Sequence, residues 1–478
     1  MSDTQSKAKA GLKWSAVERI LTQAIQLIVM LILGRMLGPS AFGLIAMLTI
    51  FIAISQTMVD SGFSSALIRK QDRKEVDFST TFYFNILVSI SCYILLFGSA
   101  PYIASFYEQP TLTLLLRVLG IGVVINALAV VQRAKLTIEV DFKTQAKASF
   151  LAVVFSAAIA ITMAYLGYGV WALVAQTLSF YAVSAITLNI LSPWIPKTGF
   201  SKESFTELFG FGSKLLLSSL IDTIYNNIYQ LVIGKFFTAS QLGYFSQAKN
   251  LSHIPSLTLT TIIQRVNYPL LSKIQDDNEK LESAYVLTLR LSSLFIFPII
   301  LGIGLISTPL VNILLGSAWG PTSELISILC FGYMLYPIHA INLNLLQVKG
   351  RSDLFLKLEI IKKTLITIIL FVTIPLGIKA ITIGMVVQSY VSLCINTYYT
   401  GKLTSLSSSK QLRFLFPIWS IAIFSALISS VWFNFLDSDI FQIIIVLSSA
   451  LFLYIISIRV IQKDLYLYVV NNILGKIK

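Results

Sequence analysis

Fourteen apolar segments, each long enough to cross a lipid bilayer, occupy most of this 478-residue chain and leave only short polar stretches between them. A hydrocarbon core about 30 Å thick requires about 20 residues of helix per crossing. Because lipid offers the backbone no hydrogen-bond partners, each crossing must be a helix or part of a closed barrel, and segments of this length exclude strands. The sequence therefore predicts an all-α polytopic membrane protein with about 14 transmembrane helices. The expected spans are 14–37, 41–67, 80–104, 111–132, 148–166, 170–192, 205–236, 241–272, 284–308, 322–347, 354–376, 380–401, 413–433 and 440–461.

The positive charges give the expected orientation of these spans. One set of alternate loops, together with both termini, holds 28 of the 36 Lys and Arg residues, and the opposite loops hold only Arg35, Lys235 and Lys379. Since cytoplasmic loops are the ones enriched in Lys and Arg, both termini are expected in the cytoplasm. The net charge of +14 then reflects these loops and an anionic lipid surface. No compact basic domain is visible, so nucleic acid is not an expected partner.

A weak internal repeat indicates a duplication. The motif Gly34-Arg35-Met36-Leu37, with Ser40 and Gly43 after it, returns 200 residues later as Gly234-Lys235-Phe236-Phe237, with Ser240 and Gly243. Six spans separate equivalent points, and an even number gives both copies the same orientation. Transporters built from such parallel repeats place their substrate path between the two halves. We expect a six-helix lobe at 1–200, a second at 201–403, and two additional helices with a cytoplasmic tail at 404–478.

Charged and polar side chains inside the predicted spans are the candidates for function. A charge at the bilayer centre costs at least about 2.5 kcal/mol, so such groups should face a cavity or a partner. The spans 14–37 and 205–236 are equivalent in the repeat, and each carries a polar stripe at helical spacing. Arg and Lys suit an anionic head group, whereas carboxylates suit a coupling proton or Na⁺. Snorkelling at span ends and structural hydrogen-bonded pairs are the alternative interpretations. The head-group candidates are Arg19, Gln26, Lys214, Asn226, Lys249 and Arg265, and the ion-coupling candidates are Glu18, Asp60 and Asp222.

Catalytic and cofactor signatures are missing from the sequence. It contains no GxxxxGK[ST] phosphate loop and no HExxH metal motif, and its two histidines, His253 and His339, lie far apart. We therefore expect no cofactor and no metal site, with H⁺ or Na⁺ as the coupling ion of a transporter.

Several longer motifs resemble those of bacterial polysaccharide transporters and O-antigen flippases. They are LILGRMLGPSAFGLIAMLTIF, DSGFSSALIRK, TFYFNIL, GYGVWALVAQTL, SPWIPKTGFS, GYFSQAKNLSHIP and YPLLSKIQDDNEKL. The resemblance spans roughly residues 10–400 and points to the colanic-acid-exporter-like branch of the multidrug/oligosaccharidyl-lipid/polysaccharide exporter superfamily. It implies two six-helix lobes in a V that open alternately to either side of the bacterial inner membrane. It also implies a substrate, the undecaprenyl-diphosphate-linked oligosaccharide repeat unit, and a polysaccharide polymerase as partner. The family has no short signature that would transfer site residues.

Two other functions remain open at this point. A cation-coupled multidrug antiporter of the same superfamily would favour acidic cavity residues, and the spans hold somewhat more basic ones. A glycan polymerase or ligase would need a sizeable outer loop, and the longest one here, about 309–321, is short. The sequence therefore predicts a flippase rather than an enzyme.

Overall fold

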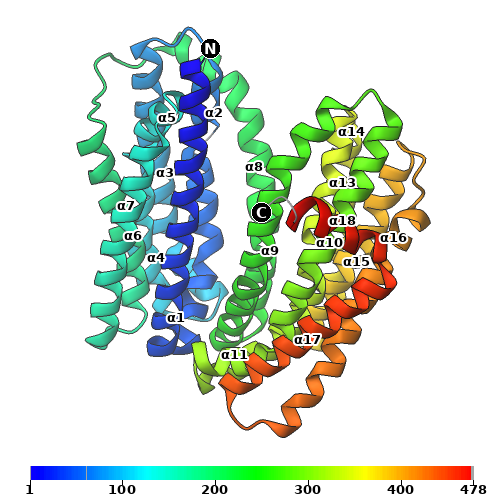
Figure 1. Cartoon of the computed structure of the whole chain (residues 1–478). Coiled ribbons are helices and arrows are strands. Elements are labelled where there is room, and N and C mark those ends of the chain that lie inside the picture. Colours follow the sequence, from blue (N-terminus) through cyan, green and yellow to red (C-terminus); the bar gives the residue numbers. More distant parts are fainter. Residues whose placement is uncertain (1, 61, 475–478) are drawn as a thin grey trace. The chain divides into compact units, whose positions relative to one another are not determined.

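The computed structural model describes residues 2–60 and 62–474, and these are helical almost throughout (Figure 1). Side chains at 2–13, 15–17, 19–20, 266 and 473–474 lie outside that description. Contacts divide the chain into a first unit, Met1–Gly243, and a second unit, Tyr244–Lys478. The predicted lobes at 1–200 and 201–403 were defined by the sequence repeat, whereas the two units are defined by contacts. The division into these lobes therefore stays a prediction.

Helices of the first unit pack side by side, with α6 against α7, α1 against α6, and α3 against α4 (Figure 1). α9 (Ala239–Lys273) starts at the end of this unit and continues into the second. The helices that lie wholly in the first unit are α1 (Ser2–Asp60), α2 (Phe63–Arg69), α3 (Glu75–Phe106), α4 (Thr111–Ala127), α5 (Val130–Ile138), α6 (Phe142–Tyr165), α7 (Trp171–Leu191) and α8 (Lys202–Phe236).

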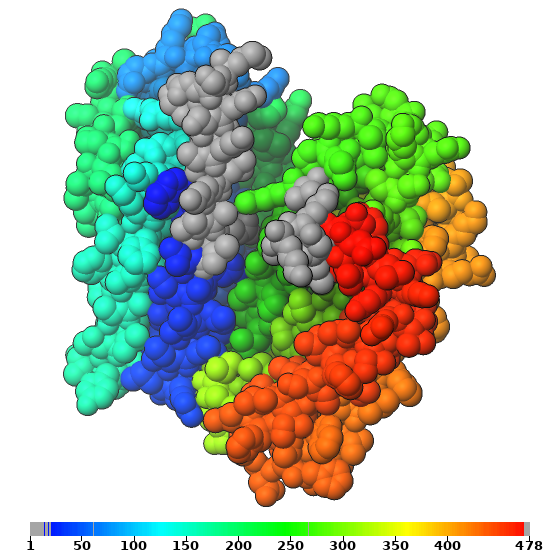
Figure 2. All heavy atoms as spheres, in the orientation of Figure 1, coloured from blue at the N-terminus to red at the C-terminus, as the bar shows by residue number. Residues whose placement is uncertain are grey.

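In the second unit, α10 is central, with contacts to α12, α13, α16 and α17. The C-terminal helices form a continuous orange-to-red band on the surface of this unit (Figure 2). Its elements after α9 are α10 (Asn278–Leu305), α11 (Ser307–Leu314), η1 (Ser317–Trp319), α12 (Gly320–Tyr333), α13 (Tyr336–Val348), α14 (Ser352–Thr373), η2 (Ile374–Leu376), α15 (Ile378–Gly401), α16 (Ser408–Ser429), η3 (Ser430–Phe435), α17 (Asp439–Ile461), α18 (Lys463–Val469) and η4 (Val470–Leu474).

The helices confirm the predicted class, an all-α polytopic membrane protein. Within the described residues, ten helical segments are long and apolar enough to cross a membrane, and the first of them, Leu21–Arg69, contains two predicted spans. α8, α9 and α14 match the other predicted spans but are not among the ten. For α8 and α9 the reason is the polar content already visible in the sequence, since their mean hydropathy is the lowest of the long helices. Each has 35 residues, or about 52 Å of helix, which exceeds a bilayer with its head groups.

Three spans expected as single helices are interrupted. Within the expected span 41–67, helix α1 ends at Asp60 and helix α2 begins after Gly62. The φ of 68° at Gly62 lies in the left-handed region, which glycine adopts readily. The span 111–132 divides into α4 and α5, and 322–347 divides after Tyr333. At the last break Pro337 occupies the first turn of α13, where its missing N–H costs nothing.

The two repeat-equivalent turns contact each other reciprocally. A Cβ atom on Gly43 would lie 1.7 Å from the carbonyl oxygen of Ala239, and one on Gly243 would lie 2.0 Å from that of Pro39. Position 39 thus contacts position 243, and position 43 contacts position 239. At the 200-residue offset, 239 is the counterpart of 39 and 243 is the counterpart of 43. Such exchange of partners is typical of a contact across a two-fold axis. It supports the duplication read from the sequence.

Small residues bring α6 close to its neighbours in the core of the first unit. Ala157, Ala160 and Ala164 follow helical spacing on α6 and pack with Val29 and Leu33 of α1. In membranes, helices associate through close packing of this kind because lipid tails are as apolar as the side chains.

The segment 192–201, which joins α7 to α8, is bonded to the start of α3. The indole of Trp194 donates to Glu75 at 2.7 Å, and the backbone N–H of Ser201 donates to the Thr80 hydroxyl at 3.1 Å. Phe63, Phe84 and Phe205 pack beside these bonds. The entry to α8 is therefore fixed within the first unit.

Candidate functional site

In the part of α1 that matches the predicted span 14–37, the structure describes the side chains of two of the three candidates, Glu18 and Gln26. Glu18 is half-buried and accepts a hydrogen bond from the Ser149 hydroxyl of α6 at 2.7 Å. Gln26 is exposed, and the side chain of Arg19 lies outside the described residues. Glu18 therefore has a partner within its own unit, as expected for a carboxylate in a membrane-spanning helix.

Asp60 belongs to a polar cluster at the end of α1. Its carboxylate interacts electrostatically with the guanidinium of Arg133, which is half-buried on α5. Tyr181 of α7 shares this environment and accepts a hydrogen bond from the Gln56 amide, one turn before Asp60. Four polar side chains from three helices thus converge, and we call Gln56, Asp60, Arg133 and Tyr181 the α1 polar cluster.

Arg133 corrects one expectation and shows a missed residue. The sequence places it at the start of a basic loop, 133–147, and counts it only as a cytoplasmic charge. In the structure it lies within α5 and interacts electrostatically with Asp60. The apolar span 111–132 ends directly before it, so its position at a helix end hid this interaction.

The candidates on α8 lie along one exposed surface of that helix. Lys214, Asp222 and Asn226 are all exposed, and Tyr229, about one turn after Asn226, is buried. α8 contacts α1 through a hydrogen bond of 2.9 Å between the Thr223 and Thr57 hydroxyls. Thr57 directly follows Gln56, a member of the α1 polar cluster. The hydrogen bond from Thr57 to Thr223 therefore links α8, with its polar surface, to the part of α1 that holds this cluster.

The remaining candidates belong to the second unit. Lys249 is half-buried on α9 and interacts electrostatically with His253, one turn later, and Arg265 is exposed. The His253 ring packs against the rings of Tyr333 and Tyr336, at centroid distances of 5.0 and 5.1 Å. These contacts fix the Lys249 end of α9 against α12 and α13.

A charged cluster near the start of α3 was not foreseen. The Lys70 ammonium lies 2.8 Å from a carboxylate oxygen of Glu207 and 3.1 Å from one of Asp77. The buried carboxylate of Asp77 also accepts from the Ser204 hydroxyl at 2.5 Å. The hydrogen bond to Glu207, together with that to Asp77, raises the pKa of Lys70 above its ordinary value. Asp77 is the third residue of α3 and caps it, which is the signal that could have indicated a structural carboxylate.

The second unit buries an uncharged polar network. The Tyr285 hydroxyl of α10 contacts the side-chain oxygens of Asn342 and Gln411, each at 2.9 Å. Thr400 bonds to both amides, and all four side chains are buried. A second group links His339 to Ser389 at 3.0 Å and to Asn396 at 3.2 Å. His339 was not among the predicted site residues, because its partners come from α15.

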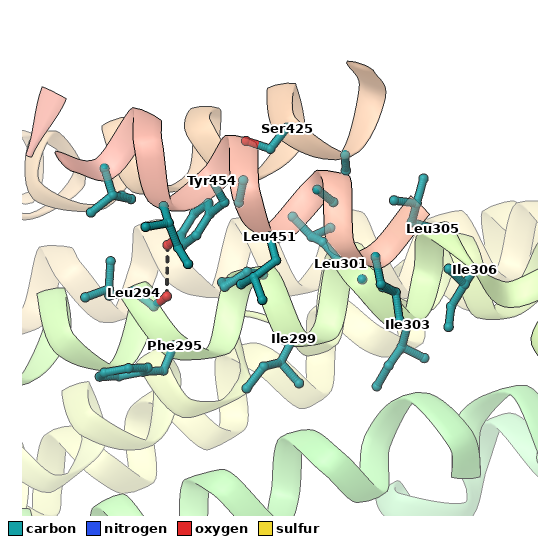
Figure 3. A pocket seen from close by; sticks show the side chains of 18 of the residues that line it. Leu294, Phe295, Ile299, Leu301, Ile303, Leu305, Ile306, Ser425, Leu451 and Tyr454 are labelled. Carbon is teal, nitrogen blue, oxygen red and sulfur yellow. Dashed lines mark hydrogen bonds between the residues drawn. The ribbon is translucent and has the colours of Figure 1, made fainter. Parts of the chain in front are cut away.

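An apolar cavity of about 820 Å³ lies in the second unit between α10, α16 and α17. Figure 3 shows Leu301 and Leu451 between α10 and α17, and the Tyr454 hydroxyl bonded to the Leu294 carbonyl at 2.8 Å. No group of three or more His, Cys, Asp or Glu in the described part of the chain could hold a metal ion.

Comparison with known proteins gives a family and a fold. The family described as "Polysaccharide biosynthesis protein" matches residues 32–324, more than half of the chain. The lipopolysaccharide biosynthesis protein WzxC of Escherichia coli is 24% identical over 422 residues, which cover 87% of this chain and 85% of the relative.

Among solved structures, the lipid II flippase MurJ matches with a TM-score of 0.75 at 13% identity, over 94% of this chain and 99% of its own. A multidrug resistance MATE transporter of the MOP superfamily matches with a TM-score of 0.64 at 16% identity, over 82% and 99% of the two chains. These two similarities establish the fold.

Proposed function

We propose that this chain, which belongs to the polysaccharide biosynthesis protein family, is a flippase for lipid-linked oligosaccharides. Its substrate would be an undecaprenyl-diphosphate-linked repeat unit, moved across the bacterial inner membrane by alternating access for surface polysaccharide assembly. The observation that carries this proposal is the family match over residues 32–324, joined by similarity to WzxC over most of both chains. A polysaccharide polymerase would use the product on the outer face.

The physical problem of such transport is the head group. A diphosphate with attached sugars is too polar to cross hydrocarbon, so it needs polar and cationic groups along its path while its prenyl tail stays in lipid. Lys214, Asn226 and Arg265 are exposed on helices long enough to span the membrane. Exposed charges on such helices are stable beside water or a substrate rather than beside acyl chains. We propose that these residues, with Arg19, Gln26 and Lys249, bind the head group.

The carboxylates are proposed as the coupling sites. Asp60 interacts electrostatically with Arg133, so proton or Na⁺ binding at Asp60 would change the charge balance of the α1 polar cluster. Glu18 and Asp222 are the other candidates. The placement of 28 of 36 positive charges in alternate loops and termini supports cytoplasmic ends for the chain. The proposed reaction is transport, with no covalent step.

The test is export in a strain that lacks its own exporter but supplies the lipid-linked repeat unit. The wild-type gene should restore surface polymer and clear the lipid-linked intermediate. Lys249→Glu should abolish both effects, because it replaces a cation with an anion on the proposed diphosphate path. Arg413→Glu, a charge reversal at an exposed position of α16 outside the candidate set, is the matched control. Normal export by Lys249→Glu would refute its head-group role, and failure of the wild type to clear the intermediate would refute the function.

The multidrug antiporter is the alternative within the same fold. The discriminating result is resistance to cationic drugs in a sensitive strain without any change in the lipid-linked intermediate. A polymerase or ligase would instead leave the intermediate flipped and unpolymerised when deleted.

A further inference from the structure

One face of α10 changes its chemical character in three steps along the helix. Glu279, Glu282 and Ser283 come first, Arg290 follows about two turns later, and a continuous apolar surface begins at Leu294. Glu279, Glu282, Arg290 and Leu294 are separated by three, eight and four residues, so these side chains lie along one side of the helix. The order is acidic, cationic and then apolar.

The apolar part of this face lines the 820 Å³ cavity between α10 and α17. From Leu294 to Ile306 the helix rises about 18 Å. Half of a hydrocarbon core is about 15 Å, so the cavity has the depth of one leaflet. Nearly all of its lining is apolar, and the buried hydroxyl of Tyr454 is already bonded to the backbone of α10.

Arg290, one turn before Leu294, lines a second and more open cavity of about 550 Å³ with polar residues in its lining. One terminal nitrogen of its guanidinium donates to the Gln462 side chain at 3.0 Å. Its Nε is buried and has no hydrogen-bond partner among the described residues. A buried donor without a partner costs about 1–3 kcal/mol, and more on a charged group. Arg290 is therefore held in place with a donor still to be satisfied.

The polar cavity also contains two carboxylates. Glu279 and Glu282 line it together with Arg290, and Glu282 accepts a hydrogen bond from the Ser405 backbone at 2.6 Å. No ion pair joins either glutamate to Arg290 in the described residues. The Arg290 guanidinium and the two carboxylates therefore line the same cavity without forming ion pairs with one another.

We propose that this face of α10 binds a zwitterionic glycerophospholipid of the surrounding leaflet. The phosphate contacts Arg290, the ammonium of the head group lies toward Glu282 and Glu279, and an acyl chain fills the cavity beyond Leu294. The two carboxylates favour a lipid whose head group carries an ammonium over one whose only head-group charge is the phosphate. The depth of one leaflet suits an acyl chain, whereas a prenyl tail of eleven isoprene units is far longer. The site lies wholly in the second unit and does not depend on the proposed transport function.

The experiment measures lipid binding by the purified full chain in detergent, using native mass spectrometry with added phosphatidylethanolamine or phosphatidylglycerol. The wild type should retain phosphatidylethanolamine in preference. Arg290→Gln should weaken both lipids by about tenfold or more, the loss expected for one charge-assisted hydrogen bond. Glu282→Gln should reduce the preference for phosphatidylethanolamine and leave phosphatidylglycerol binding in place. Glu279→Gln repeats that test at a carboxylate without the Ser405 bonds.

Two further variants separate lipid binding from folding. Ala450→Phe adds a ring to the apolar cavity without changing charge and should displace both lipids. Arg413→Gln removes an exposed arginine that lines neither cavity and should bind lipid as the wild type does. Equal binding by Arg290→Gln and Arg413→Gln would overturn the proposal, as would the absence of retained lipid in the wild type. Displacement of phosphatidylethanolamine by equimolar undecaprenyl phosphate would also overturn it, because the cavity would then belong to a prenyl chain.

Discussion

Charged side chains form the α1 polar cluster of the first unit, whereas neutral side chains form the buried network of the second unit. Asp60 interacts electrostatically with Arg133, and Glu18 accepts from Ser149. In the second unit, helices are joined by hydrogen bonds among Tyr285, Asn342 and their hydroxyl and amide partners, and all of these side chains are uncharged.

This difference separates fixed packing from groups that can change state. A fully bonded amide and hydroxyl network has little desolvation cost left, and it specifies one arrangement of four helices. A charged pair is costlier to keep from water and responds to protons, ions and anionic ligands. We infer that the neutral network stabilises the second unit, whereas the α1 polar cluster serves transport.

The largest effect is expected at the two repeat-equivalent turns around Gly43 and Gly243, because these turns pack directly against each other. Gly43→Val would place its branched side chain where the Ala239 carbonyl oxygen lies. We expect a loss above about 4 kcal/mol, so that little monodisperse protein survives size-exclusion chromatography. Gly98→Val is the control, since nothing lies within 4 Å of the Cβ position at Gly98. Normal yield from Gly43→Val would show that the reciprocal contact is loose.

The neutral network should affect stability rather than transport. Asn342→Leu removes one of the two side-chain acceptors of the Tyr285 and Thr400 hydroxyls, so that both buried hydroxyls depend on Gln411 alone. A loss of about 2–3 kcal/mol in the free energy of unfolding is expected. Thermal unfolding of the purified protein measures it, and export per folded molecule should be unchanged. Reduced export at normal stability would remove the distinction between the two units.

The α1 polar cluster should show the opposite behaviour. Arg133→Gln leaves the Asp60 carboxylate without its cation, and we expect export to fall about tenfold, equivalent to about 1.4 kcal/mol. Because Asp60 is exposed, the change in stability should stay below about 1 kcal/mol. A double-mutant cycle with Asp60→Asn measures the coupling. If the two substitutions add independently in export assays, the pair has no joint role.

The Lys70 cluster should give the smallest effect. Glu207→Gln removes the carboxylate nearest to Lys70, and the pair is partly exposed, so a loss below about 1 kcal/mol is expected at neutral pH. Since pairing raises the pKa of Lys70, its contribution is present below the ordinary lysine value and is lost as pH rises through the raised value. The wild type and Glu207→Gln should therefore converge in melting temperature at high pH. A difference that persists there would assign the effect to packing.

For the candidate site, the sequence identified individual charged residues but not the side chains that they contact. It singled out Asp60 and Glu18 because a charge in an apolar span is visible without a structure. It assigned Arg133 to a loop and gave His339 no role, since the partners of both come from other helices. The breaks at Gly62 and Tyr333 were also missed, because hydropathy registers apolar length and not backbone direction.

The sequence by itself determined the class of this protein and the approximate positions of its long apolar helices, and it indicated a duplication. A transmembrane helix satisfies its own backbone, so length and hydropathy define it locally. The 200-residue offset between Gly43 and Gly243 is likewise a property of the linear chain. Only the tertiary structure decided that these glycines lie against each other's turns, that Arg133 interacts with Asp60, and that α10 carries an acidic, cationic and apolar face beside a cavity. Such pairings depend on helix packing between distant segments, and periodicity along one helix does not specify which neighbour it meets.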